Sequence, residues 1–350
     1  MAASPPAWVS AVAAFKVGIS RDVVTKDGTM FGDAAFEVLN DPAVQWEILP
    51  DLVPALTPEH AAGYDAICLL SAKLTRETLS APDCRLGLVA RFGVGYDSVD
   101  VPACTERGVL VAITPDAVRR PVGTSVIAYV LALAHRMVLK DRLVRDGRWA
   151  EKGNHLGTGL VGRTLGVVGV GNIGREVLRL ARPFGLRLLG ADPHVRQADV
   201  DDLGVTMTDL PTLLAESDFV SINCLLDDDT RGLIGAAEFA RMKPTAYFIN
   251  TSRGPTVVES ALVDAVREGR IAGAAIDVFE REPTPVDNPL LAFDNVIVAP
   301  HAICHTDECM RGLAESAFRA SVSLARGERP PYLVNPEALA HPRWAGRFHR

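Results

Sequence analysis

Short apolar runs alternate with helical or turn-rich segments along the first 115 residues. The apolar runs predict strands, and they are residues 15–19, 45–49, 66–70, 86–90 and 109–113. Helical patterns lie between them, at residues 33–39, 58–62, 75–79 and 101–107. This βα repetition predicts a parallel sheet with helices on both faces, and ligands bind such sheets at the carboxyl ends of the strands.

A single long helix is predicted from Pro121 to about Arg145. It is apolar on more than one face, whereas a surface helix has one apolar stripe, so we expect it to be buried, partly by another subunit. The loop that follows, residues 147–162, is long enough to predict a contact or functional role.

A second βα series follows this loop. Its predicted strands are residues 165–168, 187–191, 219–224, 247–250, 274–278 and 296–299. Its predicted helices begin at the glycine-rich turn near residue 172 and continue with 210–215, 236–242 and 260–268. A terminal helix is predicted over residues 306–325, and the proline-rich tail 326–350 is expected to be a solvated or packed extension.

The turn after the strand 165–168 has the glycine spacing of a dinucleotide site. Gly169 permits a tight turn, Gly171 lets backbone approach a pyrophosphate, and Gly174 lets the helix pack closely on the strand. Asn172 and Ile173 complete the turn, at a helix N-terminus where free N–H groups favour an anion.

A carboxylate follows the next strand at the expected distance. Asp192 lies 192 − 174 = 18 residues past the last glycine, near the spacing of a ribose-binding acid. It would accept hydrogen bonds from a 2′-hydroxyl and repel a 2′-phosphate. The sequence therefore predicts NAD rather than NADP, although Arg196 is close enough in sequence to weaken the preference.

Composition and charge narrow the class of protein. At 350 residues, with 48% hydrophobic and 23% charged residues, the chain suits an ordinary soluble protein of two domains. A net charge of −7 gives no basic surface for nucleic acid. The longest apolar run, 126–134, is short of the ~18 residues that a membrane span needs.

The start of the chain and the cysteines predict a location. The first 14 residues are alanine-rich, and no Lys or Arg precedes Lys16, so a secretory signal is not expected. Six dispersed cysteines without a C-x-x-C pair are typical of reduced thiols. We therefore expect a cytoplasmic protein.

Three polar residues follow predicted strand ends. Arg253 lies in Asn-Thr-Ser-Arg-Gly, Glu282 in Phe-Glu-Arg-Glu-Pro and His301 in Ala-Pro-His. If these strands belong to one parallel sheet, all three side chains rise at the edge that carries the glycine turn. Each alone is more typical of a structural ion pair or hydrogen bond, and only their convergence indicates a site.

Hydride transfer with a coupled proton is the chemistry that this set supports. His301 would donate a proton to a carbonyl oxygen in reduction and accept it in oxidation. Glu282 would hold the other imidazole nitrogen and favour the charged ring. Arg253 offers a planar fork to a carboxylate and can polarise the carbonyl.

A glycine-containing loop follows the strand 86–90. Its sequence is Arg-Phe-Gly-Val-Gly-Tyr-Asp, residues 91–97. Two glycines one residue apart can make backbone N–H groups accessible as a small-anion cradle, and a plain tight turn is an equally good interpretation.

The sequence resembles the D-isomer-specific 2-hydroxyacid dehydrogenase family. The resemblance covers roughly residues 60–325 and rests on several motifs in family order: GVVGVGNIG, Asn-Thr-Ser-Arg-Gly, AIDVFEREP, Pro-His at 300–301, and RFGVGYDSVD followed by RGVLVAITP. It implies an NAD(H)-dependent oxidoreductase that interconverts a D-2-hydroxy acid and its 2-oxo acid, such as glycerate, hydroxypyruvate, glyoxylate or a phosphoglycerate-like acid.

The resemblance also implies roles for individual residues. Arg253, Glu282 and His301 would be the catalytic set, and Asp277 would meet the nicotinamide carboxamide. Cys224 would lie beside the adenosine and Thr251 near the nicotinamide half of NAD. Val94 and Gly95 would bind the substrate carboxylate through backbone N–H groups, together with Arg253.

The expected architecture is α/β with two domains. A Rossmann-type NAD-binding domain would span 119–306, and a smaller flavodoxin-like substrate domain would be discontinuous, formed by 1–118 and 307–350. The resemblance further implies a cleft that closes on ligand and a homodimer joined through the nucleotide domain.

Departures from the family pattern leave alternatives open. Cys304 and His305 follow His301 where relatives often carry small or aromatic residues, so His301, Cys304, His305 and Cys309 could be metal ligands, but their spacing fits no common zinc pattern. No metal is therefore predicted.

Two other functions are considered. One is an NAD(H)-sensing corepressor-type binding protein, and the other is oxidation of a sugar acid or phosphite on the same scaffold. Lys73, Arg91 and Arg119 are candidate cations for a phosphorylated substrate.

Overall fold

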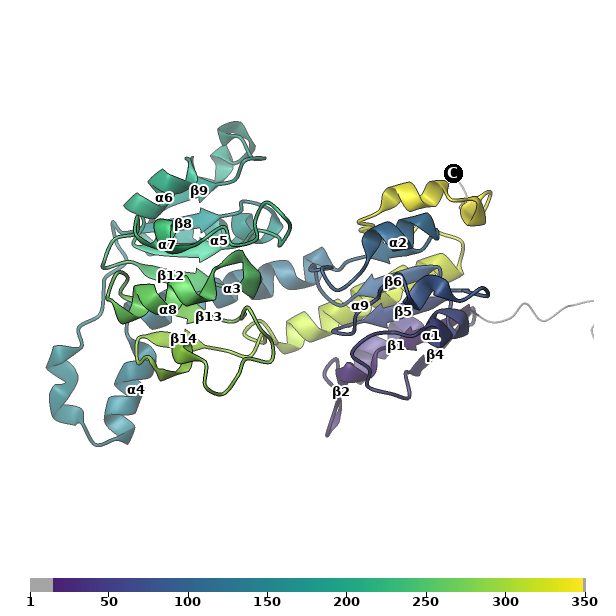
Figure 1. Ribbon diagram of the computed structural model, residues 1–350, viewed down its shortest axis with the longest axis horizontal. Coiled ribbons are helices and arrows are strands. Elements are labelled where there is room, and N and C mark those ends of the chain that lie inside the picture. Colours follow the sequence, from purple (N-terminus) through teal and green to yellow (C-terminus); the bar gives the residue numbers. More distant parts are fainter. Residues whose placement is uncertain (1–14, 349–350) are drawn as a thin grey trace, which may run out of the picture. The chain divides into compact units, whose positions relative to one another are not determined.

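The computed structural model describes residues 15–348, so the alanine-rich start of the chain lies outside the described residues. The described chain divides into two compact units (Figure 1). One comprises residues 15–118 and 306–348, and the other comprises Arg119–His305. The chain leaves the first unit within α3 (Pro115–Ala134) and returns between His305 and Thr306.

The first unit contains a five-stranded parallel sheet in the order β4-β1-β5-β6-β7. Counted along the chain, that order is 2-1-3-4-5, the flavodoxin-like arrangement. The strands are β1 (Phe15–Ile19), β4 (Val44–Ile48), β5 (Ala66–Leu69), β6 (Leu88–Arg91) and β7 (Leu110–Ala112). A small antiparallel ribbon, β2 (Val24–Thr25) with β3 (Gly28–Thr29), precedes β4.

Helices cover the sheet of the first unit. They are α1 (Pro58–Gly63), α2 (Val101–Glu106) and α9 (Asp307–Ala325). The core beside α1 and α2 is mainly aliphatic, whereas α9 contributes Phe318 to an aromatic group with Phe31, Phe36 and Phe92. The tail after α9 packs against this unit. Asn335 Oδ1 accepts Val111 N–H, its Nδ2 donates to Val109 O, and Trp344 is 5% exposed.

The second unit contains a seven-stranded parallel sheet in the order β10-β9-β8-β11-β12-β13-β14. Counted along the chain this is 3-2-1-4-5-6-7, the Rossmann order with one more strand. The strands are β8 (Thr164–Val168), β9 (Arg187–Ala191), β10 (Thr206–Met207), β11 (Phe219–Ile222), β12 (Tyr247–Asn250), β13 (Gly273–Ile276) and β14 (Val296–Val298). The predicted fold class, α/β with a Rossmann-type and a flavodoxin-like part, is confirmed.

Each face of this sheet carries its own core. Alternate residues of one strand point to opposite faces, so Val220 joins a cluster with α6 (Leu210–Glu216), α7 (Ala236–Phe239) and α8 (Glu259–Arg267). Phe219 joins the other, with α3 and α5 (Asn172–Ala181).

The predicted helix from Pro121 to about Arg145 is wrong in its extent. The structure has α3 from Pro115 and a separate α4 (Met137–Arg145), because Arg136 adopts a left-handed conformation with φ 52° that ends the first helix. By length and composition α3 could cross a membrane, and 61% of its most apolar window is buried inside the structure. Its residues Val126, Tyr129 and Val130 pack in the core beside the sheet.

Two other predicted helices are 3-10 helices. The segment Asp33–Leu39 is a 3-10 helix. In place of the helix predicted at residues 75–79, the structure has a short 3-10 helix at Thr78–Ser80. Apolar spacing over five to seven residues fits either kind of helix, so the pattern could not separate them. Trp149–Asn154, in the long loop, is also a 3-10 helix.

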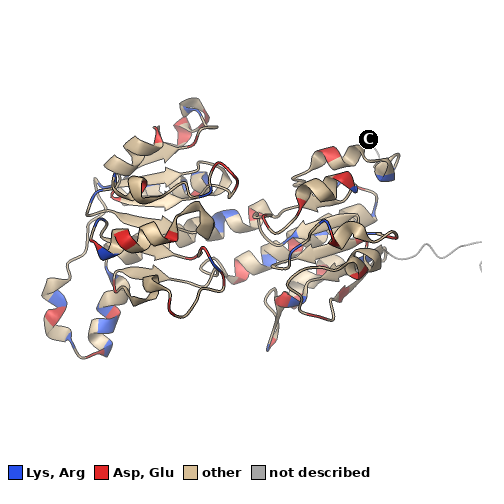
Figure 2. Ribbon diagram, in the orientation of Figure 1, with Lys and Arg blue, Asp and Glu red and all other residues tan. Residues whose placement is uncertain are grey.

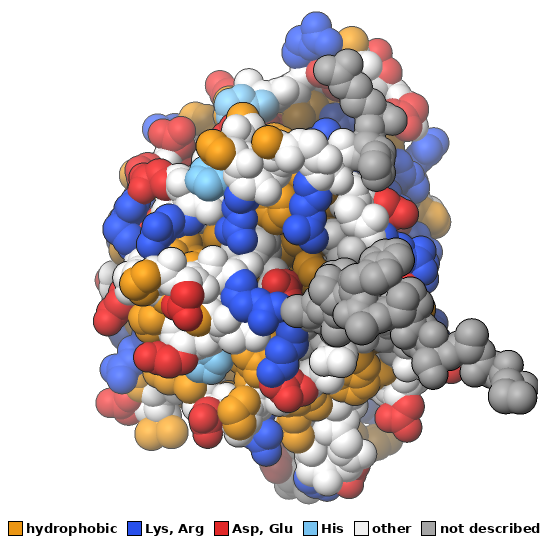
Figure 3. Space-filling view, turned by 90° about the vertical axis from the view of Figure 1, so that its right-hand side faces the viewer, with side chains coloured by type: hydrophobic (Ala, Val, Ile, Leu, Met, Phe, Trp, Pro, Cys, Tyr) orange, Lys and Arg blue, Asp and Glu red, His pale blue; other side chains and the backbone are white. Residues whose placement is uncertain are grey.

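Acidic and basic residues are interspersed along the ribbon (Figure 2), and side chains of both signs lie on the face drawn in Figure 3. Many form exposed ion pairs, such as Arg76 with Glu106 and Arg148 with Glu151. Pairs this exposed contribute at most about 1 kcal/mol each to stability.

Candidate active site

The glycine turn between β8 and α5 leaves no room for side chains at two positions. A Cβ at Gly169, where φ is +86°, would lie 2.6 Å from Cys224 N, and one at Gly174 would lie 2.1 Å from Gly169 O. A Cβ at Gly171 would meet nothing within 4 Å. The turn is therefore packed tightly against the sheet and open at the helix N-terminus, as a bound pyrophosphate requires.

Asp192 lies beside this turn, directly after β9. One carboxylate oxygen accepts Val170 N–H at 2.8 Å and the other accepts His194 N–H at 2.9 Å. Arg196, which could have offset the charge of Asp192, instead pairs with Asp199 through two hydrogen bonds of 3.0 and 3.2 Å. Asp192 is therefore not paired with Arg196, and its carboxylate suits a ribose hydroxyl.

Two buried polar atoms lie at neighbouring strand ends without a hydrogen-bond partner among the described residues. They are Asn223 Oδ1 and Thr251 Oγ1. Because Ile222 pairs with Asn250 in register, the two residues that follow are neighbours at the edge that carries the glycine turn. Buried polar atoms are rarely left unpaired, so this pair fits a bound polar ligand such as the cofactor.

Sequence reasoning missed Asn223. The available signal was an amide at the end of an apolar run, next to Cys224, which the sequence did single out. Asn223 Nδ2 donates to the Ser221 carbonyl and hydroxyl, which directs Oδ1 away from that strand. Burial raises the pKa of the Cys224 thiol to about 11, so this side chain is neutral beside the site.

Arg253 is positioned by a compact turn after β12. Its carbonyl accepts hydrogen bonds from Asn250 Nδ2 and Thr256 Oγ1, at 3.0 and 2.7 Å, and its Nη1 donates to Ser252 O at 2.8 Å. The next residue, Gly254, packs directly on backbone, because a Cβ there would lie 1.9 Å from the Phe279 carbonyl. The Arg253 turn is therefore in contact with the segment that leads to Glu282.

His301 and Glu282 form a hydrogen-bonded pair. His301 Nδ1 lies 2.8 Å from Glu282 Oε2, and Glu282 Oε1 accepts Phe279 N–H at 2.9 Å. Burial raises the pKa of Glu282, but the hydrogen bonds from His301 and Phe279 outweigh it and hold that pKa below its ordinary value. An ionised Glu282 accepts from Nδ1–H, so Nε2 is the imidazole nitrogen available to a substrate.

Asp277 holds the backbone around His301. It follows β13 and is 3% exposed, and its Oδ1 accepts Ala302 and Ile303 N–H at 2.9 and 3.1 Å. Burial raises the pKa of Asp277, and these two bonds offset only part of that rise. His301 itself has φ 54°, a left-handed conformation that few residues other than glycine adopt.

The predicted strand ends belong to one sheet. Gly169, Asp192, Asn223, Thr251, Arg253, Asp277 and His301 each follow a strand of the parallel sheet of the second unit, on strands that are consecutive from β9 to β14. Within the described residues, no group of three or more His, Cys, Asp or Glu side chains is placed to hold a metal ion. Burial lowers the pKa of His305, the other imidazole of this loop.

Val94 and Gly95 lie in the first unit, in the loop after β6. No hydrogen bond joins the N–H of either residue to another described residue. Lys73 and Arg119, two of the candidate cations for a phosphate, are exposed, whereas Arg91 is 8% exposed at the end of β6.

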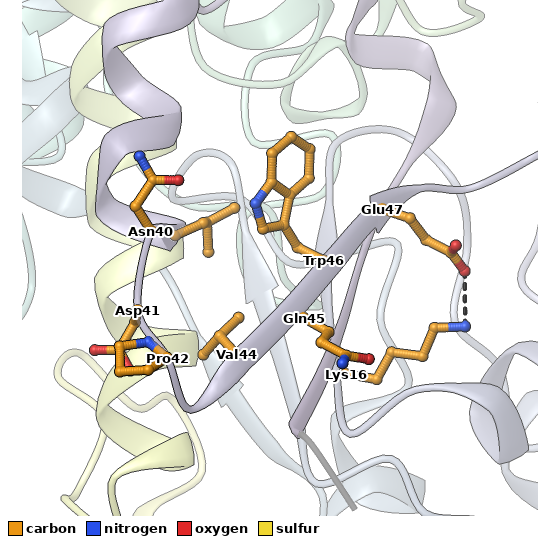
Figure 4. A pocket seen from close by; sticks show the side chains of 9 residues that line it. Lys16, Asn40, Asp41, Pro42, Val44, Gln45, Trp46 and Glu47 are labelled. Atoms are coloured by element: carbon orange, nitrogen blue, oxygen red, sulfur yellow. Dashed lines mark ion pairs between the residues drawn. The ribbon is translucent and has the colours of Figure 1, made fainter.

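A hollow of about 720 Å³ in the first unit lies elsewhere, over β4 and the preceding turn (Figure 4). Its charged residues are already paired: Lys16 with Glu47 at 2.8 Å, and Asp41 with Arg326 at 2.5 Å. None of the predicted site residues lines it.

Comparison with known proteins agrees with this geometry. Residues 127–302 match the family model "D-isomer specific 2-hydroxyacid dehydrogenase, NAD binding domain". A glyoxylate reductase of Korarchaeum cryptofilum is 42% identical over 276 residues, which are 78% of this chain and 83% of that protein.

Solved structures are similar over nearly the whole chain. A glyoxylate reductase from Paecilomyes thermophila matches with a TM-score of 0.80 and 28% identity, over 93% of this chain and 99% of that one. D-lactate dehydrogenase from Aquifex aeolicus, complexed with NAD and lactic acid, matches with a TM-score of 0.78 and 28% identity, over 89% and 96%. The chain therefore belongs to the D-isomer-specific 2-hydroxyacid dehydrogenase family, as an NAD-dependent oxidoreductase that acts on 2-hydroxy and 2-oxo acids.

Proposed function

We propose that this enzyme reduces a small, unphosphorylated 2-oxo acid, glyoxylate or hydroxypyruvate, to the D-2-hydroxy acid. The observation that carries the proposal is the His301–Glu282 pair with Arg253 beside it, at the edge of the sheet that carries the dinucleotide turn. Similarity to glyoxylate reductases supports the choice of substrate.

The residues divide the reaction between them. The hydride comes from reduced NAD when it is bound. His301 donates its Nε2 proton to the carbonyl oxygen as negative charge develops there. Glu282 holds Nδ1 and stabilises the charged ring before the transfer. Arg253 binds the substrate carboxylate and polarises the carbonyl through its planar fork.

Further residues are proposed to bind the substrate carboxylate and the cofactor. Val94 and Gly95 N–H bind the substrate carboxylate. Asp192 holds the adenosine ribose, and Asp277, Thr251 and Asn223 face the nicotinamide half. The unit Arg119–His305 is the NAD-binding domain, and residues 15–118 with 306–348 form the substrate domain.

A substrate panel tests the proposal. Turnover of glyoxylate, hydroxypyruvate, pyruvate and 3-phosphohydroxypyruvate is measured with NADH and with NADPH. We expect kcat/KM to be highest for glyoxylate or hydroxypyruvate with NADH. A preference for the phosphorylated acid, or NADH binding without turnover of any member of a wider panel, contradicts it.

Replacement of Asp192 should weaken the preference for NADH. Asp192→Asn keeps a side-chain acceptor for the turn but removes the charge that repels a 2′-phosphate, so the NADPH/NADH ratio of kcat/KM should rise roughly 10-fold, as for the loss of about 1.4 kcal/mol of discrimination. Asp228→Asn, at an exposed carboxylate after β11, is the control. An unchanged ratio would remove Asp192 from the ribose.

The Glu282–His301 pair should make stability depend on pH. Because the pKa of Glu282 lies below its ordinary value in the folded protein, its contribution is present above the ordinary pKa of about 4.5 and is lost as pH falls through the lowered one. The Tm of wild type should therefore exceed that of Glu282→Gln near pH 6, and the difference should shrink below pH 4. Scanning calorimetry from pH 3 to 7 measures it. A difference that grows with acidity contradicts the assignment.

We also infer that two copies associate through the second unit. In Figure 1, α4 and the segment after it project from the rest of this unit. Large apolar side chains are exposed there: Met137, Val144, Trp149, Leu156 and Val161. A hollow of about 300 Å³, lined by apolar side chains together with Arg136 and Asp294, lies between the end of α3, α4 and the amino ends of β12, β13 and β14. Exposed apolar surface of this kind favours association, and light scattering should give twice the 37.5 kDa of one chain.

A further inference from the structure

Arg91 is a buried cation that donates to backbone carbonyls of two separate segments. It ends β6 and is 8% exposed. Its Nη1 donates to Leu69 O at 3.1 Å and to Leu70 O, where β5 ends, and its Nε donates to Gly95 O at 2.9 Å. One guanidinium thus joins the end of the neighbouring strand to the 93–95 loop.

The other end of the 93–95 loop is held by Thr114. Gly93 N–H donates to Thr114 Oγ1 at 2.8 Å, and Thr114 N–H donates to Gly93 O at 3.0 Å. Gly93 has φ +130°, which glycine alone adopts without strain. Between these two attachments, the N–H groups of Val94 and Gly95 donate to no described residue.

We propose that Arg91 is the positioning residue of the substrate carboxylate site. Its bond to Gly95 O, with the Thr114 bonds to Gly93, fixes the peptide planes of the 93–95 loop so that two N–H groups stay available for an anion. Its positive charge behind the loop adds a favourable field for that anion. The inference rests on the proposed function, in which the carboxylate binds at Val94 and Gly95.

The geometry requires arginine rather than lysine. A planar guanidinium offers donors in fixed directions from Nε and Nη1, and here they reach carbonyls on different segments at once. An ammonium is a compact charge at the end of a flexible stem, so it cannot reproduce that pattern. These bonds also direct Arg91 toward backbone, which assigns it to the loop and not to a substrate phosphate.

Two substitutions of Arg91 test the proposal. Arg91→Met approximates the volume without charge or donors, and Arg91→Lys keeps the charge alone. Oxamate is an unreactive carboxylate analogue of the substrate. For both variants, the KM for glyoxylate and the inhibition constant of oxamate should rise about 10- to 100-fold, which is the change expected when one to two charge-assisted hydrogen bonds are lost. We expect kcat to change by less than about threefold and NADH affinity to stay constant, since NADH binds the other unit.

A general loss of folded structure would instead lower kcat and NADH binding together with the melting temperature. Arg76→Met, which removes an exposed arginine of the same unit that pairs with Glu106, is the matched control and should leave every constant unchanged. Oxamate inhibition that is unchanged in both Arg91 variants, or fully restored by lysine, overturns the inference.

Val94→Pro separates this inference from the proposed function, because it removes one of the two N–H groups directly. We expect it to weaken oxamate inhibition as the Arg91 variants do. If Val94→Pro weakens inhibition and the Arg91 variants do not, the positioning role is wrong and the carboxylate site stands. If none of the three variants affects oxamate, the carboxylate site itself is wrong.

Discussion

His301→Asn should lower kcat for reduction of the 2-oxo acid about 10²- to 10⁴-fold, the usual contribution of a general acid. Asparagine suits this position because it tolerates the left-handed conformation that His301 adopts at φ 54°. The backbone that Asp277 holds should therefore be preserved. NADH affinity, measured by fluorescence, should stay within about twofold because the imidazole is not among the proposed cofactor contacts.

The other imidazole of the same loop provides the comparison. His305 makes no hydrogen bond to Glu282, which is paired with His301 at 2.8 Å. His305→Gln should therefore retain most of the wild-type kcat. If His305→Gln abolishes turnover while His301→Asn does not, the proton donor has been assigned to the wrong imidazole.

Arg253→Gln should lower kcat/KM about 10²- to 10³-fold, as expected when a preorganised donor to the developing oxyanion is removed. The turn should survive, because the bonds from Asn250 and Thr256 go to the Arg253 carbonyl and not to its side chain. Arg253→Lys should recover only part of the loss, since an ammonium cannot bind a carboxylate through two parallel bonds.

Steady-state kinetics with a thermal melt distinguish this result from unfolding. Arg267→Gln, which removes an exposed arginine that pairs with Asp264 on α8, should match wild type in both measurements. Full activity of Arg253→Gln would exclude this guanidinium from substrate binding and from carbonyl polarisation.

The fold was predictable because its signals are local. The strand at 164–168, the three glycines and Asp192 lie within 29 residues of one another, and Gly169 and Gly174 are each required by a close contact that the motif already implies. The βα repetition predicted a parallel sheet in each part, and the family resemblance implied the Rossmann-type and flavodoxin-like folds, whereas the order of the strands came only from the structure.

The failures concern features that no residue type marks. The chain breaks between α3 and α4 at Arg136, a residue with no special preference for φ 52°, so an uninterrupted apolar pattern concealed the break. Asn223 was missed because its signal is an Oδ1 without a partner among residues 15–348, beside Thr251, and that placement depends on the register of β11 with β12. Arg91 was recognised as a cation, but only the folded loop shows that it donates to carbonyls.

Gly254 packs on the Phe279 carbonyl, and this contact joins the turn that carries Arg253 to the segment that leads to Glu282. A methyl group at 254 would separate these two backbones and displace Arg253 and Glu282 in the same event. The spacing of the guanidinium and the carboxylate is therefore set by one backbone contact, and neither side of that contact can be altered alone.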